Sequence, residues 1–205
     1  MCFLRYEMKM KRLPFPCIAV ILATAFPAVL SAAPEVYEID PVHSTVAFKI
    51  RHFFTEVPGR FKDFSGTITV DLENLEQFST EATINAASID TANEKRDKHL
   101  RSADFFDVEK YPEIIFKSEG VEPTGEKGAK VKGSLTIHGV TKEVDLDTKL
   151  LGKGKGMEGE MKTGWKATTT INRKDFGLNW GTVIEGTAVV ADEVDIELNI
   201  EANRK

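Results

Sequence analysis

The residues best suited to chemistry or ligand binding lie in one charged stretch, Thr91–Asp107, which reads TANEKRDKHLRSADFFD. Arg96, His99 and Leu100 recur at intervals of three and four, so a helix would place them on one face. That face offers a permanent cation, a titratable imidazole and an apolar side chain, which together could contact the polar head of a ligand. The same residues could instead dock the helix through hydrogen bonds to backbone carbonyls, and the pattern leaves both interpretations open.

The helix that would present this face is predicted to run from Glu94 to about Arg101. Asn93 precedes it and can act as the N-cap, because its side-chain oxygen can accept a hydrogen bond from an early backbone N–H. Glu94 with Lys98, and Asp97 with Arg101, place an acid four residues before a base. Each such pair contributes roughly 0.2–0.5 kcal/mol. The sequence therefore predicts one short helix with two local ion pairs.

A search for other reactive groups returns little. His43 and Ser44 are adjacent at the start of a predicted strand, but neighbours on an extended chain point to opposite faces and cannot share a proton usefully. The histidines have no metal-ligand spacing, and the chain has neither a Gly-rich phosphate loop nor a G-x-S-x-G motif. We therefore predict no catalytic residues, no metal site and no cofactor.

The first 33 residues have the pattern of a signal peptide. Four basic residues precede a mostly apolar run over residues 13–30, which ends in Ser31-Ala32-Ala33. Prolines interrupt the run, so a permanent membrane helix fits less well. We predict cleavage near Ala32 or Ala33, export to the periplasm or beyond the cell, and a single domain over residues 34–205.

Charge and cysteine content narrow the function further. The leader holds four of the 27 Lys and Arg residues and one of the 32 Asp and Glu residues, so residues 34–205 carry a net charge of −8. This balance argues against nucleic acid as a partner. Both cysteines, Cys2 and Cys17, lie in the leader. The exported chain therefore has no disulfide, cysteine nucleophile or cysteine metal site.

Apolar residues alternate with polar ones along most of the remaining chain, as in half-buried strands. In the last predicted strand, residues 194–201, Val, Ile, Leu and Ile alternate with Asp, Glu, Asn and Glu. Further strands are predicted at residues 36–39, 45–50, 60–64, 66–71, 81–89, 113–118, 131–137, 140–151 and 161–171. We expect a hairpin turn at His138-Gly139, a turn at residues 57–59, a loop or helical turn at residues 72–77, and a flexible linker at residues 151–160.

About eight antiparallel strands with one apolar face each, and a single helix, favour a closed barrel over a sandwich, because closure removes edge strands. A barrel of eight strands either fills its interior with side chains or holds one small ligand. A lipid tail that buries ~600 Å² of apolar surface would gain ~15 kcal/mol. Association costs roughly 4–15 kcal/mol, so a hollow barrel could bind such a tail without special chemistry.

Several ordered motifs also resemble one known family over nearly all of residues 34–205. They are YEIDPVHSTVAFKIRH, GRFKDFSGTI, IDTANEKRDKHLRSADFFDVEKYPEIIF, GSLTIHGVTKEVDL and INRKDFGLNW. The chain resembles the YceI-like family of lipid- and polyisoprenoid-binding proteins. The resemblance implies an all-β, lipocalin-like, extended antiparallel barrel around an apolar pocket. It further implies a periplasmic carrier or sequestering protein for an amphiphilic isoprenoid or quinone-like lipid, without turnover. A membrane b-type cytochrome and a homodimer are further expected partners.

Candidate ligand contacts are apolar residues on the strands, with cations and histidines for the lipid head. The wall candidates are Phe48, Ile50, Phe61, Phe64, Phe105, Phe106, Phe116, Trp165, Phe176 and Trp180. Arg96 and His99 are the leading head-group candidates, followed by His43, Arg51 and Arg173. Arginine could grip a diphosphate through paired donors. Each could instead make a structural hydrogen bond or ion pair.

Two alternatives to a carrier stay open at the level of sequence. The barrel could be an isomerase or cyclase that acts on an enclosed lipid with His99 as the general base. It could also be a filled barrel that displays loops to a membrane protein.

Overall fold

The fold is described from a computed structural model, which places residues 33–184 and 186–205. The predicted leader, apart from Ala33, lies outside the described residues. Within the described part of the chain, no helix has both the length and the apolar character needed to cross a membrane.

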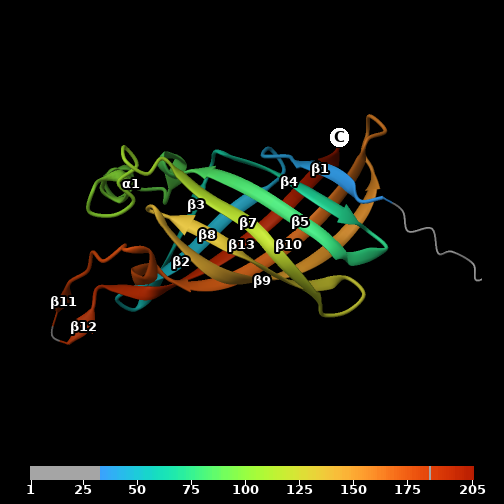
Figure 1. Ribbon diagram of the computed structural model, residues 1–205. Helices are drawn as coiled ribbons and strands as arrows, with labels where there is room; N and C mark the ends of the chain where they lie inside the picture. Colours follow the sequence, from blue (N-terminus) through green and yellow to red (C-terminus); the bar gives the residue numbers. More distant parts are fainter. Residues whose placement is uncertain (1–32, 185) are drawn as a thin grey trace, which may run out of the picture. The chain divides into compact units, whose positions relative to one another are not determined.

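Eight antiparallel strands close into a barrel in the order β1-β4-β5-β7-β8-β9-β10-β13, with β13 pairing back to β1 (Figure 1). This confirms the predicted all-β barrel with one helix. The strands are β1 (Glu35–Ile39), β2 (Thr45–His52), β3 (Thr55–Phe61), β4 (Phe64–Asp71), β5 (Asn74–Asn85), β6 (Ile89–Asp90), β7 (Glu113–Pro123), β8 (Gly128–Ile137), β9 (Val140–Lys155), β10 (Met161–Asn172), β11 (Val183–Ile184), β12 (Thr187–Ala188) and β13 (Val190–Arg204). The helices are η1 (Ala86–Ser88), α1 (Glu94–Arg101) and η2 (Arg173–Phe176).

Bends divide three long strands of the barrel into pairs of shorter ones: β1 with β2, β3 with β4, and β5 with β6. Both β1 and β2 pair with β13, at registers that include Tyr37 opposite Arg204 and Val46 opposite Leu198. On the other side of this pair, β4 pairs with β1 and β3 pairs with β2. In turn, β5 pairs with β4 and β6 pairs with β3. The bends carry the wall toward α1, which lies at the same end as β11 and β12 (Figure 1).

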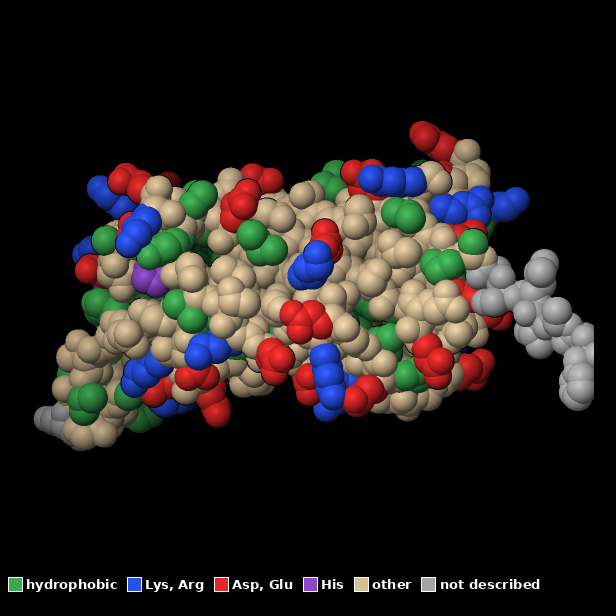
Figure 2. Space-filling view, viewed as in Figure 1, with side chains coloured by type: hydrophobic (Ala, Val, Ile, Leu, Met, Phe, Trp, Pro, Cys, Tyr) green, Lys and Arg blue, Asp and Glu red, His purple; other side chains and the backbone are tan. Residues whose placement is uncertain are grey.

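The alternation predicted for the strands separates the inside of the barrel from the outside. Val194, Ile196 and Leu198 of β13 line the interior, while Glu197 pairs on the outside with Lys166 at 3.2 Å. Figure 2 shows acidic and basic side chains interspersed over the visible face. Exposed pairs of this kind contribute only about 0–1 kcal/mol each, so the apolar interior supplies most of the stability.

The core has two main parts along the barrel. At the end opposite α1, a tightly packed group contains Tyr37, Ile68, Val70, Leu75, Leu150, Trp165 and Ala202. At the α1 end, buried residues such as Val46, Ile89 and Phe176 form a second group, against which Leu100 of α1 packs. The first group closes one end of the barrel, whereas the second surrounds the end that α1 covers.

Several predicted boundaries are wrong. Residues 57–59, expected to turn, lie inside β3, and the chain instead turns at Phe53, which adopts a φ of 51°. Residues 74–77 belong to β5 rather than to a loop, and β9 continues to Lys155 through the first half of the expected linker. The hairpin turn at His138-Gly139 is confirmed, with φ values of 50° and 74°.

The helix and its cap are confirmed, but its ion pairs are not. Asn93 accepts a hydrogen bond from the backbone N–H of Arg96 at 3.0 Å. Neither predicted pair occurs among the ion pairs of the described residues. Asp97 is buried and accepts from the backbone N–H of Thr91 at 2.9 Å. Arg101 donates to the carbonyl oxygen of Ile89 at 2.6 Å, so both side chains tie α1 to the barrel rim.

Candidate functional site

The barrel encloses a cavity of about 590 Å³ that is lined almost entirely by apolar side chains. The exposed lining residues His52, Asn93 and Lys95 all lie at the α1 end. At the other end the lining residues Trp165 and Ile68 are buried, and the remaining ones, such as Phe78, are half-buried. The cavity is therefore a blind pocket with its mouth beside α1. Its volume lies within the range of about 300–1,000 Å³ that is typical of small-molecule sites.

Trp165 and Phe78 form the floor of the pocket. Their ring centroids lie 5.3 Å apart in an edge-to-face arrangement, which is favourable for aromatic pairs. The indole Nε1–H of Trp165 donates to the hydroxyl of Thr163 at 3.0 Å, so the polar atom of this buried ring is satisfied. The floor is thus fixed by packing and by one hydrogen bond.

Two glycines in the barrel wall make room for aromatic rings that lie against them. Gly59 of β3 pairs with Phe48 of β2, and a methyl group at Gly59 would overlap the Phe48 ring. Gly133 of β8 makes the same allowance for Phe116 of β7. Because each ring lies over a residue without a side chain, it can lie along the wall instead of pointing across the pocket.

At the mouth, Arg96 is held by Thr91. Its Nε donates to the hydroxyl of Thr91 and its Nη2 to the Thr91 carbonyl oxygen, both at 2.7 Å. Asp97 accepts from the same hydroxyl, which completes a small buried network. Within the described part of the chain, Nη1 of Arg96 has no hydrogen-bond partner. The guanidinium group is therefore fixed at the edge of the pocket, and its Nη1 can donate to a ligand.

Three aromatic rings lie together across the mouth. His99 is edge-on to Phe105 and to Trp180, with centroid distances of 5.1 and 5.3 Å, and Phe105 lies 5.1 Å from Trp180. Nε2 of His99 is 3.0 Å from a carboxylate oxygen of Asp104. This cluster joins α1 to the segment after η2, two regions that are distant in sequence. The cluster forms an aromatic surface at the mouth of the pocket, beside the guanidinium group of Arg96.

A model of the YceI-like domain matches residues 37–202. The chain belongs to the YceI-like family. A UPF0312 protein of Pseudomonas putida strain W619 is 39% identical over 186 residues, which cover 89% of this chain and 94% of the relative. A UPF0312 protein of Pseudomonas syringae pv. syringae is 37% identical over 190 residues, or 91% and 96% of the two chains.

Solved structures support the same YceI-like fold. The YceI protein of Campylobacter jejuni superposes with a TM-score of 0.67 at 34% identity, covering 74% of this chain and 87% of that protein. BcnA of Burkholderia cenocepacia gives a TM-score of 0.70 at 27% identity, with coverages of 80% and 98%. A polyisoprenoid binding domain from Saccharophagus degradans gives 0.62 at 15% identity, with coverages of 82% and 98%.

Most of the residues predicted as ligand contacts border the pocket of this YceI-like barrel. They are Phe48, Ile50, Phe61, Arg96, His99, Phe105, Phe106, Phe116, Trp165, Arg173 and Trp180. Arg173 has a structural task there. It donates to the carbonyl oxygens of Ala191 at 2.8 Å and Trp180 at 2.7 Å, and burial lowers its pKa against the opposing effect of Asp192.

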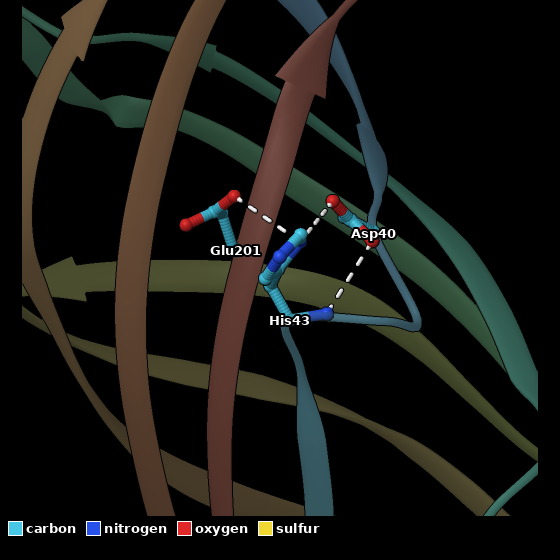
Figure 3. A group of neighbouring side chains, drawn as sticks. All are labelled: Asp40, His43 and Glu201. Atoms are coloured by element: carbon cyan, nitrogen blue, oxygen red, sulfur yellow. Dashed lines mark hydrogen bonds and ion pairs between the residues drawn. The ribbon is translucent and has the colours of Figure 1, made fainter. Parts of the chain in front are cut away.

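Four predicted contacts lie away from the pocket. Phe64 and Phe176 are buried in the core at the α1 end, where they pack against other buried side chains and do not border the pocket. Arg51 alternates with the inward-facing Ile50, so it points outward and donates to the carbonyl oxygen of Phe53. His43 lies in the bend between β1 and β2, where its side chain is 61% exposed and contacts Asp40 instead of the pocket (Figure 3).

Some mouth residues were missed from the sequence. His52, Thr91, Asn93 and Lys95 border the pocket entrance. Thr91 and Asn93 adjoin the charged stretch, and their closeness to Arg96 was the available signal. His52 shares the inward half of the alternation in β2 with Phe48 and Ile50, so period two was the available signal, but the strand was predicted to end at residue 50.

Proposed function

We propose that this YceI-like protein binds an amphiphilic isoprenoid lipid, with the hydrocarbon tail in the barrel and the polar head at the mouth beside α1. The observation that carries the proposal is the blind apolar cavity of about 590 Å³. Burying one methylene gains about 0.8 kcal/mol. A tail of fifteen to twenty carbons, roughly the length of three or four isoprene units, therefore gains about 12–16 kcal/mol, against a cost of association of roughly 4–15 kcal/mol.

The mouth suits a head that is polar but small. Arg96 supplies donors that match a phosphate or an alcohol oxygen. Lys95, which is exposed at the entrance, adds a second cation. The name of the Saccharophagus degradans domain, a polyisoprenoid binding domain, supports this ligand class by likeness of fold.

The role proposed is that of a carrier or store in the periplasm. A lipid that leaves a membrane must be shielded from water on its way, and a closed barrel does this without catalysis. The leader pattern of residues 1–33 supports export. A membrane b-type cytochrome as the recipient, and a homodimer, remain predictions.

Native mass spectrometry with added farnesol and geranylgeraniol tests the proposal. We expect a one-to-one complex in the wild type. Ala167→Phe should abolish it, because Ala167 is buried on the pocket wall and a phenyl ring there would fill the interior. Lys166→Phe introduces the same ring one residue away, on the outer face, and should leave binding intact. No complex in the wild type, or equal loss in both variants, would contradict the proposal.

An enzymatic alternative has one observation in its favour. His99 borders the pocket and is paired with Asp104, as a general base often is with an orienting carboxylate. An isomerase or cyclase would convert the bound lipid over time and lose that activity in His99→Gln. Recovery of unchanged lipid after prolonged incubation would favour the carrier.

A further inference from the structure

A group of possible metal ligands lies on the outer wall, away from the lipid pocket. Asp40 directly follows β1, His43 lies in the bend before β2, and Glu201 faces outward from β13 (Figure 3). Nδ1 of His43 is 2.8 Å from Oδ2 of Asp40 and 3.8 Å from Oε1 of Glu201. The three donor atoms all lie within 4.8 Å of one another.

Backbone hydrogen bonds fix the bend that presents these side chains. The N–H of Asp40 donates to the carbonyl oxygen of Glu201 at 2.9 Å. The hydroxyl of Ser44 donates to the same carbonyl at 3.2 Å and accepts from the N–H of Glu201 at 3.0 Å. The ligands therefore come from two segments more than 150 residues apart that are already joined, so binding an ion would need little ordering of the chain.

The two oxygens of Asp40 have separate tasks. Oδ1 accepts from the backbone N–H groups of Val42 at 2.9 Å and His43 at 3.4 Å, which closes the bend. Oδ2 is directed at the imidazole. The carboxylate can thus keep its structural role through one oxygen while the other binds an ion.

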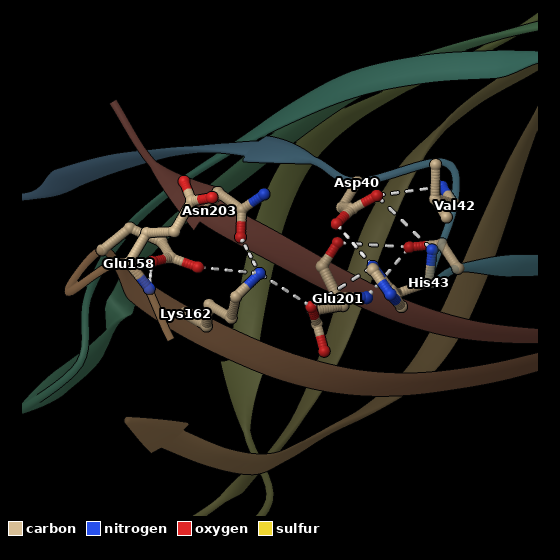
Figure 4. A network of polar contacts seen from close by, with 9 residues as sticks. Asp40, Val42, His43, Glu158, Lys162, Glu201 and Asn203 are labelled. Carbon is tan, nitrogen blue, oxygen red and sulfur yellow. Dashed lines mark hydrogen bonds and ion pairs between the residues drawn. The ribbon is translucent and has the colours of Figure 1, made fainter. Parts of the chain in front are cut away.

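The surrounding charge favours a cation. Lys162 lies beside Glu201, and its ammonium group contacts Glu201 at 3.0 Å and Oδ1 of Asn203 at 2.7 Å (Figure 4). The same ammonium group is 3.2 Å from Glu160. With Asp40, which contacts His43, this part of the surface holds three carboxylates and one lysine. The hydrogen bond to the Asp40 carboxylate raises the pKa of His43, so an ion would compete with a proton for Nδ1.

We propose that Asp40, His43 and Glu201 form a surface site for a divalent transition-metal ion such as Zn²⁺, Ni²⁺ or Cu²⁺. One imidazole and two carboxylates suit these ions better than Ca²⁺ or Mg²⁺, which take oxygen ligands almost exclusively. Bonds of about 2.0–2.2 Å place neighbouring ligand atoms roughly 3–3.5 Å apart. The 2.8 Å between His43 and Asp40 would have to widen slightly, and a rotation of the half-buried Glu201 side chain would shorten its 3.8 Å distance to Nδ1. Water would complete the coordination. The bound ion would join the break between β1 and β2 to β13.

Isothermal titration calorimetry with Zn²⁺ on untagged, chelator-treated protein tests the site. We expect one ion per chain, and His43→Ala should weaken binding at least about tenfold, because even indirect support of a metal ligand is worth 10–100-fold. His138→Asn is the matched control. It removes a histidine from a distant turn whose positive φ asparagine tolerates, and it should bind as the wild type does.

Lys162→Met provides a second test with the opposite sign. Removing the ammonium group frees Glu201 and removes a nearby positive charge, so it should tighten Zn²⁺ binding. The proposal is overturned if the wild type binds no Zn²⁺ at millimolar concentration. It is equally overturned if His43→Ala binds as tightly as the wild type, or if His138→Asn loses binding to the same extent.

Discussion

Trp165 forms the floor of the pocket and should therefore limit the length of the lipid tail that fits. The variant Trp165→Leu tests this. The ring is only 4% exposed and closes the pocket against Phe78. Large-to-small changes at buried aromatic positions cost about 3–5 kcal/mol when alanine is introduced. Leucine retains part of the volume, so we expect a smaller loss and a folded protein. The hydroxyl of Thr163 also loses its indole partner.

The gain for a longer ligand follows from the space that the change opens. One more isoprene unit buries about five carbon groups, worth up to about 4 kcal/mol at roughly 0.8 kcal/mol each. Relaxation of Phe78 into the space will remove part of this gain. If a third is realised, the preference for the longer tail rises about tenfold.

The assay is a competition among farnesol, geranylgeraniol and geranylfarnesol, with affinities measured for each variant and the melting temperature recorded. We expect the optimum of Trp165→Leu to move toward the longer tail by about tenfold relative to the wild type. Trp180→Leu changes the other tryptophan, at the mouth, and should keep the wild-type preference. A folded Trp165→Leu protein with an unaltered length preference would refute the assignment of the floor.

Three further outcomes follow from the site and its surroundings. Gly59→Val should push the Phe48 ring into the pocket and weaken lipid binding, while circular dichroism reports an intact barrel; unchanged affinity would show that the ring has room elsewhere. Arg96→Met should weaken binding of farnesyl phosphate more than that of farnesol, and equal loss for both ligands would exclude a head-group contact. In Asp40→Asn, an NMR titration should show the raised pKa of His43 fall toward its ordinary value. Because that pKa is raised in the folded state, protonated His43 stabilises the fold below its unfolded-state pKa, and the contribution is lost as pH rises through the folded-state value. A His43 pKa that does not move would contradict the pairing.

The inward and outward faces of the strands were predictable because alternation reports burial directly. Val194, Ile196 and Leu198 were placed on one face by period alone, and they line the pocket. The helix was equally clear, since Asn93 caps a run of good helix formers. Neither inference needed knowledge of distant contacts.

The bends and turns were less predictable. Pro58 and Gly59 suggested a turn, but they lie within β3, where Pro58 pairs with Lys49 and Gly59 with Phe48. The real turn uses Phe53 in a left-handed conformation that a bulky residue rarely adopts. The turn preference of Pro58 and Gly59 is overridden by the pairing of β3 with β2, which depends on residues outside this segment.

Hollowness could not be deduced from the pattern either. Whether eight apolar faces fill a barrel depends on side-chain volumes across strands, such as glycine at position 59 beneath Phe48. The same limit applies to the roles of the cations. Arg96 and Arg173 were both candidates for the lipid head. Arg173 donates to the carbonyl oxygens of Trp180 and of Ala191 in β13. Nη1 of Arg96, in contrast, has no hydrogen-bond partner among the residues that the structure describes. Only the folded positions of their neighbours separate them.

The central claim is that the barrel interior holds the lipid tail, and a crystal structure of the protein saturated with geranylgeraniol tests it most directly. We predict continuous tubular density from the mouth at Arg96 and His99 to the floor at Trp165, with the alcohol at the mouth. An interior that remains empty, or lipid found only on the outer wall, would contradict the account.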